Sequence, residues 1–373
     1  MAVAIATTTI FPVGQFLESY SANLRKFGRE KDVTIYIAGD RKSPPDSGEV
    51  AQQFCKEGFQ IEFMDITYQR DYLGRFPDLA AIIPENSDNR RNVAYLRALE
   101  EGADVVISVD DDNFPVPDVD FVDEHLHVGR KLTLPEAVGY NNWYNLCDLL
   151  EPKIPGLYPR GFPYWARHKD TGRVKGTTTG QVGINVGLWK GDPDTDAIGR
   201  LYCAPHIKGD RGIAVMLGTE VRSPINTQNT GLSRQVMAVY YYIRMGDKLC
   251  GMYLDRFGDI FSGYFAQACV AAVGERIRIG SPVADHRRNQ HNLLVDLYHE
   301  LAGIMVLEDL SRFLVDVQLP HDSYLSAYRA LSAELEGFTD NAEGFIWQPE
   351  TKKYFHKIGS YMRIWADVVA DII

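Results

Sequence analysis

The sequence predicts an α/β fold, with a mostly parallel sheet flanked by helices and a helical extension at the C-terminus. Three observations support this prediction. The chain opens with a strand–helix–strand pattern, Val105–Val109 is typical of a strand buried on both faces, and apolar residues recur at helical spacing after His291. We expect one domain over residues 1–290 and the helical extension over residues 291–373.

The opening pattern predicts strands at residues 3–10 and 33–38, separated by a helix at 15–27, and a third strand at 60–66. Asp40 follows the second strand. A carboxylate there suits contact with a base or ribose, and a solvated turn explains it equally well. Neither G-x-G-x-x-G nor G-x-x-x-x-G-K-[ST] occurs, which disfavours a dinucleotide-dependent oxidoreductase and a P-loop NTPase.

A helix is expected between residues 82 and 102, with a cap among residues 87–89 and Gly102 as its stop signal. Arg90 and Arg91 fall in its first turn, which is the unfavourable end of a helix for cations. An anionic diphosphate bound at this helix start would supply the missing charge partner.

Three adjacent carboxylates, Asp110, Asp111 and Asp112, follow the apolar strand Val105–Val109. Like charges beside a buried strand are costly unless a cation offsets them. Alternate acids on an extended tip can share a hard divalent ion. The Asp-x-Asp pattern therefore indicates a metal site, although Asp-rich loops also occur as solvated turns.

Beyond residue 291 a long helix is expected over residues 293–310 and a second over 323–335, before an aromatic-rich end. We expect this extension to pack on the first domain. Its sequence contains no recognisable catalytic or binding motif. A role in forming a homo-oligomer is a further hypothesis.

Composition narrows the function classes. The net charge of −11 and a pI near 5.3 disfavour nucleic-acid binding. Five scattered cysteines without a C-x-x-C pair predict reduced thiols in a cytoplasmic protein, and no run approaches the ~20 apolar residues of a membrane span. His125 and His127 lie in an acidic loop, where we expect solvent-exposed histidines rather than metal ligands.

Four segments together carry a family resemblance. They are ISVDDDN at the apolar strand, RGFPYWAR from Arg160 to Arg167, GINVGLWKGDPDTDA from Gly183 to Ala197, and DRFGDIFSGYF from Asp255 to Phe265, the last followed by SPVADH. Their order resembles that in the reversibly glycosylated polypeptides of plants, the family that includes UDP-arabinopyranose mutases. The resemblance implies a glycosyltransferase-A fold over roughly residues 1–290, with Mn²⁺ or Mg²⁺ as cofactor.

The same resemblance implies roles for individual residues. Asp110 and Asp112 would hold the metal, with His286 as a third ligand. The nucleotide pocket would be formed by Thr9, Asp40, Asp88, Arg91 and Asp111.

Two further residues are implied as catalytic. Asp259 would bind the sugar or act as a base; alternatively it caps a helix over residues 261–271. Arg167 matches the arginine that is glycosylated in the plant proteins. A guanidinium is a poor nucleophile, so we favour an ion pair between Arg167 and a phosphate or an acid of the aspartate cluster.

The expected function is a metal-dependent glycosyltransferase that uses a UDP- or GDP-sugar donor and a small-molecule or glycan acceptor. Differences from the family, such as Gly258 in place of an aspartate, fall in the sugar and acceptor region. They weaken the expectation of mutase activity more than that of nucleotide-sugar binding. A UDP-sugar mutase and a non-catalytic sugar-nucleotide-binding subunit are the alternatives.

Overall fold

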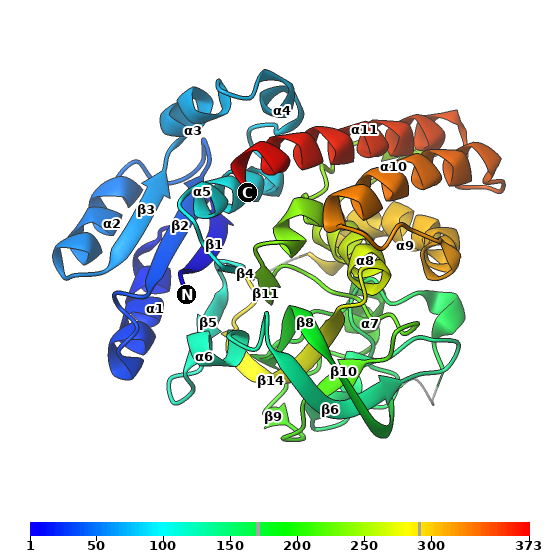
Figure 1. Cartoon of the computed structure of the whole chain (residues 1–373), viewed down its shortest axis with the longest axis horizontal. Coiled ribbons are helices and arrows are strands. Elements are labelled where there is room, and N and C mark those ends of the chain that lie inside the picture. Colours follow the sequence, from blue (N-terminus) through cyan, green and yellow to red (C-terminus); the bar gives the residue numbers. More distant parts are fainter. Residues whose placement is uncertain (169–171, 290–291) are drawn as a thin grey trace.

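The computed structural model describes residues 1–168, 172–289 and 292–373, and a ten-stranded sheet lies at its centre (Figure 1). The strand order is β3-β2-β1-β4-β11-β8-β6-β10-β14-β5. Helices flank the sheet, and three long helices end the chain. The α/β class and the C-terminal helices predicted from the sequence are therefore confirmed.

The first half of the chain alternates strands and helices, as predicted. Its elements are β1 (Val3–Thr9), α1 (Gly14–Phe27), β2 (Val33–Gly39), α2 (Ser47–Lys56), β3 (Gln60–Met64), α3 (Ile66–Leu73), α4 (Pro77–Ile82), the 3-10 turn η1 (Asp88–Arg90), α5 (Arg91–Glu100) and β4 (Val105–Val109). The four strands pair in parallel, so the carboxyl ends of β1, β2 and β4 meet at one edge of the sheet.

Local chemistry sets the ends of α1 and α5. Gly28 follows α1 with φ 68°, a left-handed conformation that glycine adopts without a steric penalty. Gly102 does the same after α5, with φ 83°, at the predicted stop. Ahead of α5, the Ser87 hydroxyl accepts a hydrogen bond from the Asn89 amide at 3.2 Å, which satisfies a donor of the first turn.

β4 is buried on both faces, as its apolar run predicts. Val106 belongs to the apolar cluster that contains Leu96 of α5. Ile107, which points to the opposite face, belongs to the cluster that contains Leu17 of α1. The chain that leaves β4 is thereby held between two packed layers, which fixes where the three aspartates begin.

The second half of the sheet is mixed. Its elements are β5 (Asn113–Pro115), α6 (Phe121–His125), β6 (Lys131–Val138), η2 (Leu146–Leu149), β7 (Leu150–Glu151), η3 (Tyr164–Ala166), β8 (Arg173–Gly191), α7 (Ala197–Tyr202), β9 (Gly209–Asp210), β10 (Val215–Leu217), β11 (Asn229–Ser233), η4 (Val236–Val239), β12 (Lys248–Leu249), β13 (Met252–Tyr253), α8 (Gly258–Ala272) and β14 (Arg276–His286). β8 pairs antiparallel with β6 and β11 and parallel with β14. β14 also pairs with β5, which brings His286 beside Asn113 and the aspartates.

The C-terminal helices are α9 (Leu293–Asp316), α10 (Tyr324–Asn341) and α11 (Pro349–Ile372). They pack on one another and against α8, α4 and α5 (Figure 1). Their buried residues, such as Leu310 and Trp365, belong to the same apolar cluster as residues of the sheet. The predicted domain boundary at residue 290 stays a prediction. Within the described residues no helix is long and apolar enough to cross a membrane. All five cysteines are free thiols.

Candidate functional site

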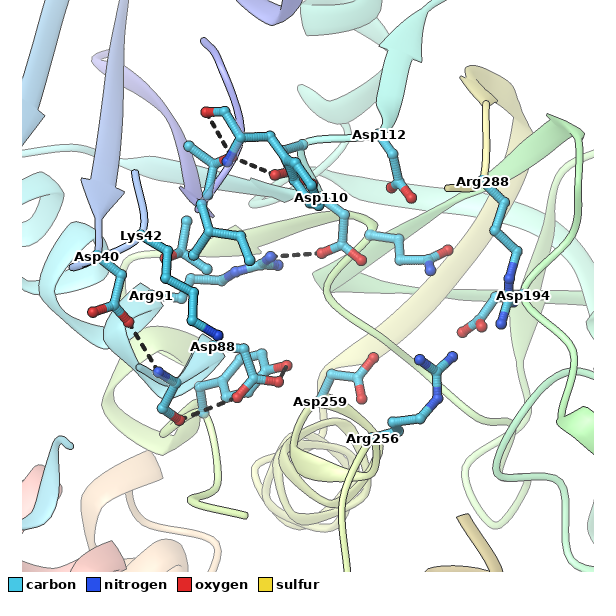
Figure 2. Close-up of a pocket in the computed structure, with 18 of the residues that line it drawn as sticks. Asp40, Lys42, Asp88, Arg91, Asp110, Asp112, Asp194, Arg256, Asp259 and Arg288 are labelled. Carbon is cyan, nitrogen blue, oxygen red and sulfur yellow. Dashed lines mark hydrogen bonds and ion pairs between the residues drawn. The ribbon is translucent and has the colours of Figure 1, made fainter. Parts of the chain in front are cut away.

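A cavity of about 350 Å³ opens at the carboxyl ends of β1, β2 and β4 (Figure 2). The starts of α5 and α8 and the end of β14 complete its wall. Nine of the ten site residues predicted from the sequence line it, namely Thr9, Asp40, Asp88, Arg91, Asp110, Asp111, Asp112, Asp259 and His286. The tenth, Arg167, is a described residue that does not line the cavity.

Asp40 organises one end of the cavity. It is buried, and its carboxylate accepts hydrogen bonds from the amides of Arg41 at 2.7 Å, Asn86 at 2.9 Å and Ser87 at 2.9 Å. A solvated turn is therefore excluded as its explanation. Asp40 fixes the loop that leads into α5, where the hydroxyl of Tyr242 donates to Asp88 at 2.8 Å.

Arg91 finds its charge partner in Asp110. The guanidinium is 4% exposed, and its Nη2 lies 2.6 Å from Asp110 Oδ1. Its Nη1 also donates to the carbonyl of Thr227 at 3.1 Å. Burial raises the pKa of Asp110, and the charge of Arg91 opposes that rise. The cation at the start of α5 is thus balanced by the first of the three aspartates.

The other two aspartates have separate partners. Asp111 accepts a short hydrogen bond from the hydroxyl of Thr9 at the end of β1. Asp112 Oδ2 lies 3.3 Å from His286 Nε2. Burial opposes protonation of His286, but the Asp112 carboxylate outweighs burial and raises the pKa of the imidazole.

The Asp112–His286 pair suits a cation. The Nδ1–H of His286 is committed to the carbonyl of Asp192, so Nε2 and the Asp112 oxygen need a proton or a cation between them. Neighbouring ligands of an octahedral Mg²⁺ lie roughly 3 Å apart, given metal–oxygen distances of ~2.1 Å. Asp110 is turned toward Arg91 instead, and within the described residues no group of three or more metal-ligating side chains is assembled.

The opposite end of the cavity is built on Arg160, which lies in the loop between β7 and η3. Its guanidinium contacts both oxygens of Asp194, at 3.0 and 3.1 Å, and both oxygens of Asp259, at 3.0 and 2.6 Å. All three side chains are buried. Arg160 outweighs the burial of Asp194 and lowers its pKa to about 2.

Asp259 does not cap its helix. α8 begins at Gly258 rather than at residue 261, its N-cap is Phe257, and Asp259 lies in the first turn. A carboxylate there is favoured by the helix dipole, but both of its oxygens are held by Arg160. The alternative interpretation of Asp259 as a cap is therefore wrong.

Arg167 is held outside the cavity. Its Nη2 lies 2.6 Å from Asp196 Oδ2, and its guanidinium stacks 3.5 Å from the ring centroid of Tyr164 and 4.9 Å from that of Tyr158. The expectation that Arg167 pairs with an acid of the cluster after β4 is therefore wrong, because its partner is an acid that follows β8.

The structure also corrects the expectation for His125. This histidine is fully buried on α6 rather than solvent-exposed. Its Nε2–H donates to the Asn229 side chain at 2.8 Å, and its Nδ1 accepts from the Asn185 side chain at 3.0 Å. Burial lowers the pKa of His125 to about 4, so the ring is neutral at pH 7.

Several cavity residues escaped the sequence prediction. Arg160 and Asp194 occur in the segments RGFPYWAR and DPDTDA, and Arg256 lies two residues before α8. Arg288 also lines the cavity. The signal available for Arg160 was its place in the same segment as Arg167. Nothing local to Arg288 distinguishes it from a surface arginine.

Several solved structures are similar to this chain. The mannosyltransferase PcManGT from Pyrobaculum calidifontis, in complex with GDP-Man and Mn²⁺, has a TM-score of 0.42 and 10% identity, with 98% of this chain and 86% of that chain covered. Glucosyl-3-phosphoglycerate synthase from Mycobacterium tuberculosis, in complex with phosphoglyceric acid, has a TM-score of 0.39 and 12% identity over 82% and 79%. TarS from S. aureus, in complex with UDP-GlcNAc, has a TM-score of 0.39 and 11% identity over 100% and 84%.

At these identities and scores the likeness carries no conclusion about function. No protein-family model and no curated protein sequence matches the chain.

Proposed function

We propose that this protein is a metal-dependent glycosyltransferase of the glycosyltransferase-A type that uses a nucleoside-diphosphate sugar. One observation carries the proposal. Nine residues chosen from distant parts of the sequence line a single cavity at the carboxyl ends of parallel strands, where open α/β folds bind ligands. Surface residues chosen at random do not converge in this way.

The nucleotide occupies the end of the cavity built on Thr9, Asp40 and Asp88. The hydroxyl, backbone and carboxylate groups there suit the polar edges of a base and ribose. Arg91 and Lys42 also line the cavity, and their cations would pair with a diphosphate. UDP and GDP are both candidates for the nucleotide.

Asp112 and His286, with Asp110 nearby, would hold Mn²⁺ or Mg²⁺. The ion supplies positive charge to a diphosphate leaving group when it is bound. The chain itself contributes the fixed imidazole orientation through the Asp192 carbonyl and the buried setting of the acids. Asp259 is held rigidly by Arg160, which suits a role in orienting the sugar better than a role as a mobile base.

Two alternatives use the same cavity. A UDP-sugar mutase would need no acceptor, whereas a transferase acts on a small molecule or glycan. A non-catalytic subunit would bind nucleotide sugars without turnover. The crowded charged end around Arg160 favours an enzyme, because a site built only for binding needs no such buried charge network.

The test is calorimetry with UDP and GDP, each with and without Mn²⁺, on the wild-type protein and on Asp112→Ala. We expect metal-dependent binding of one nucleotide, weakened by at least about tenfold in Asp112→Ala. Asp118→Ala is a matched control, because Asp118 is an exposed acid outside the cavity. Equal affinity in wild type and Asp112→Ala would remove the metal assignment. Incubation with the sugar form of the bound nucleotide then separates turnover from binding alone.

The cytoplasmic location and the homo-oligomer remain predictions. Light scattering of the purified chain measures the oligomeric state directly.

A further inference from the structure

Two arginines frame the end of the cavity that lies opposite Asp40 and Lys42. Figure 2 shows Arg256 and Arg288 on that side, together with Asp259. Both guanidinium groups line the cavity, and their side chains are 24% and 10% exposed. Arginines this enclosed need fixed acceptors to remain ordered.

The acceptors come from the C-terminal extension. Asp296 and Glu300 are one helical turn apart on α9 and therefore share a face. Asp296 accepts from Arg288 Nη2 at 2.9 Å and lies 3.5 Å from Arg256 Nη1, while Glu300 accepts from Arg256 Nε at 3.0 Å. The two acids are 5% and 0% exposed and stand behind the arginines, outside the cavity lining.

Glu300 also ties α9 to the loop that carries Asp194. Its second oxygen accepts from the Ala197 amide at 2.7 Å, at the first residue of α7. α9 thereby fixes both the arginines and the end of the loop that supplies an acid to the cavity wall.

Arg256 has a backbone conformation that side chains rarely adopt, with φ 61°. Its carbonyl accepts from Arg160, its amide donates to Asp255 at 2.8 Å, and its side chain is held by Glu300. Strained residues persist when their surroundings over-determine them, and such residues cluster at functional sites.

The charges at this end nearly cancel. Among the described residues, the ion pairs at this end join three arginines to four carboxylates, namely Arg160, Arg256, Arg288, Asp194, Asp259, Asp296 and Glu300. A second anion, in addition to the diphosphate, would therefore gain little binding energy at this end of the cavity. Sugar hydroxyls both donate and accept hydrogen bonds, so neighbouring guanidinium and carboxylate groups suit a sugar ring.

We propose that α9 completes the sugar end of the donor cavity, with Asp296 and Glu300 as positioning residues that hold Arg256 and Arg288 toward the sugar. The proposal rests on the nucleotide-sugar function proposed above. It gives the C-terminal extension a role in the site, which its sequence did not indicate.

The experiment measures binding by calorimetry in the presence of Mn²⁺. It compares the affinity for a free nucleotide with that for its sugar form, in two pairs: UDP with UDP-glucose, and GDP with GDP-mannose. The pair that binds to wild-type protein is then measured with Asp296→Asn and Glu300→Gln. We expect affinity for the nucleotide sugar to fall by about tenfold or more, as after loss of a charged hydrogen bond, with affinity for the free nucleotide within about twofold of wild type. Asp309→Asn is the matched control, because Asp309 lies on the same helix, bonds to Trp347 and is outside the cavity.

Arg256→Lys and Arg288→Lys test the same idea from the cavity side, should the fully buried Glu300→Gln not fold. They keep the charge but lose the planar fork, so the same selective loss is expected. A merely structural role predicts a lower Tm with an unchanged ratio of the two affinities, and that result, or an equal loss for both probes, would overturn the inference. Wild-type protein that binds none of the four probes would instead overturn the proposed function, and the inference with it.

Discussion

Replacing Arg160 by lysine tests the charge network that closes the sugar end of the cavity. The guanidinium serves two carboxylates at once, Asp194 and Asp259, which are 2% and 4% exposed. One ammonium group cannot reproduce four contacts arranged in two directions, so one carboxylate loses its partner. Breaking a buried ion pair costs about 3–5 kcal/mol, and because lysine keeps part of the attraction we expect a loss of about 2–4 kcal/mol in the free energy of unfolding.

Urea denaturation at pH 7 without ligand measures this loss, read from the midpoint at an unchanged slope. Arg167→Lys is the matched control from the same segment, since among the described residues Arg167 forms an ion pair only with Asp196 and is 18% exposed. We expect a smaller loss in the control, because Arg167→Lys weakens one ion pair whereas Arg160→Lys weakens two. If Arg160→Lys costs no more than Arg167→Lys, the network does not stabilise the fold as argued.

Three further predictions concern single residues. Burial lowers the pKa of His125 to about 4, below its unfolded value of 6.5. The contribution of the neutral ring to the free energy of unfolding is therefore complete above pH 6.5 and is lost as the pH falls toward 4. Urea unfolding between pH 7 and 4.5 should show a loss of up to about 3 kcal/mol that is smaller in His125→Gln; equal pH dependence would contradict it. Asp259→Asn should keep nucleotide affinity but lower turnover by orders of magnitude in a steady-state assay, and full activity would remove Asp259 from the site. Arg167 should carry no sugar after incubation with the donor, and a stable one-sugar adduct in the intact mass, lost in Arg167→Ala, would refute its assignment as an ion-pairing residue.

The first half of the fold was predictable because its signals are local. The strands before and after α1 are both rich in apolar residues, and glycines stand where α1 and α5 end. β8 was missed because its first half is exposed and rich in threonine and glycine, so it has no apolar alternation. Its strand character comes from pairing with β6 and β14, which are distant partners that a local pattern does not reveal.

The candidate site divides in the same way. Residues at strand ends, such as Asp40 and Asp110, were identified because a strand predicts where its following side chain emerges. Arg256 and Arg288 owe their place to acids of α9, and their own neighbours in the sequence give no sign of a cavity. Family resemblance drew attention to Arg167, but the cavity takes Arg160, which lies seven positions earlier.

The three adjacent aspartates show why sequence predicts the place of a site better than the role of each member. Their mutual repulsion indicated one shared cation, yet each acid has a partner from a different element: Arg91 of α5 for Asp110, Thr9 of β1 for Asp111 and His286 of β14 for Asp112. Part of the charge is therefore balanced by the protein itself. Only the third acid faces a side chain of a metal-ligating type, so Asp112 is the substitution that bears most directly on metal binding.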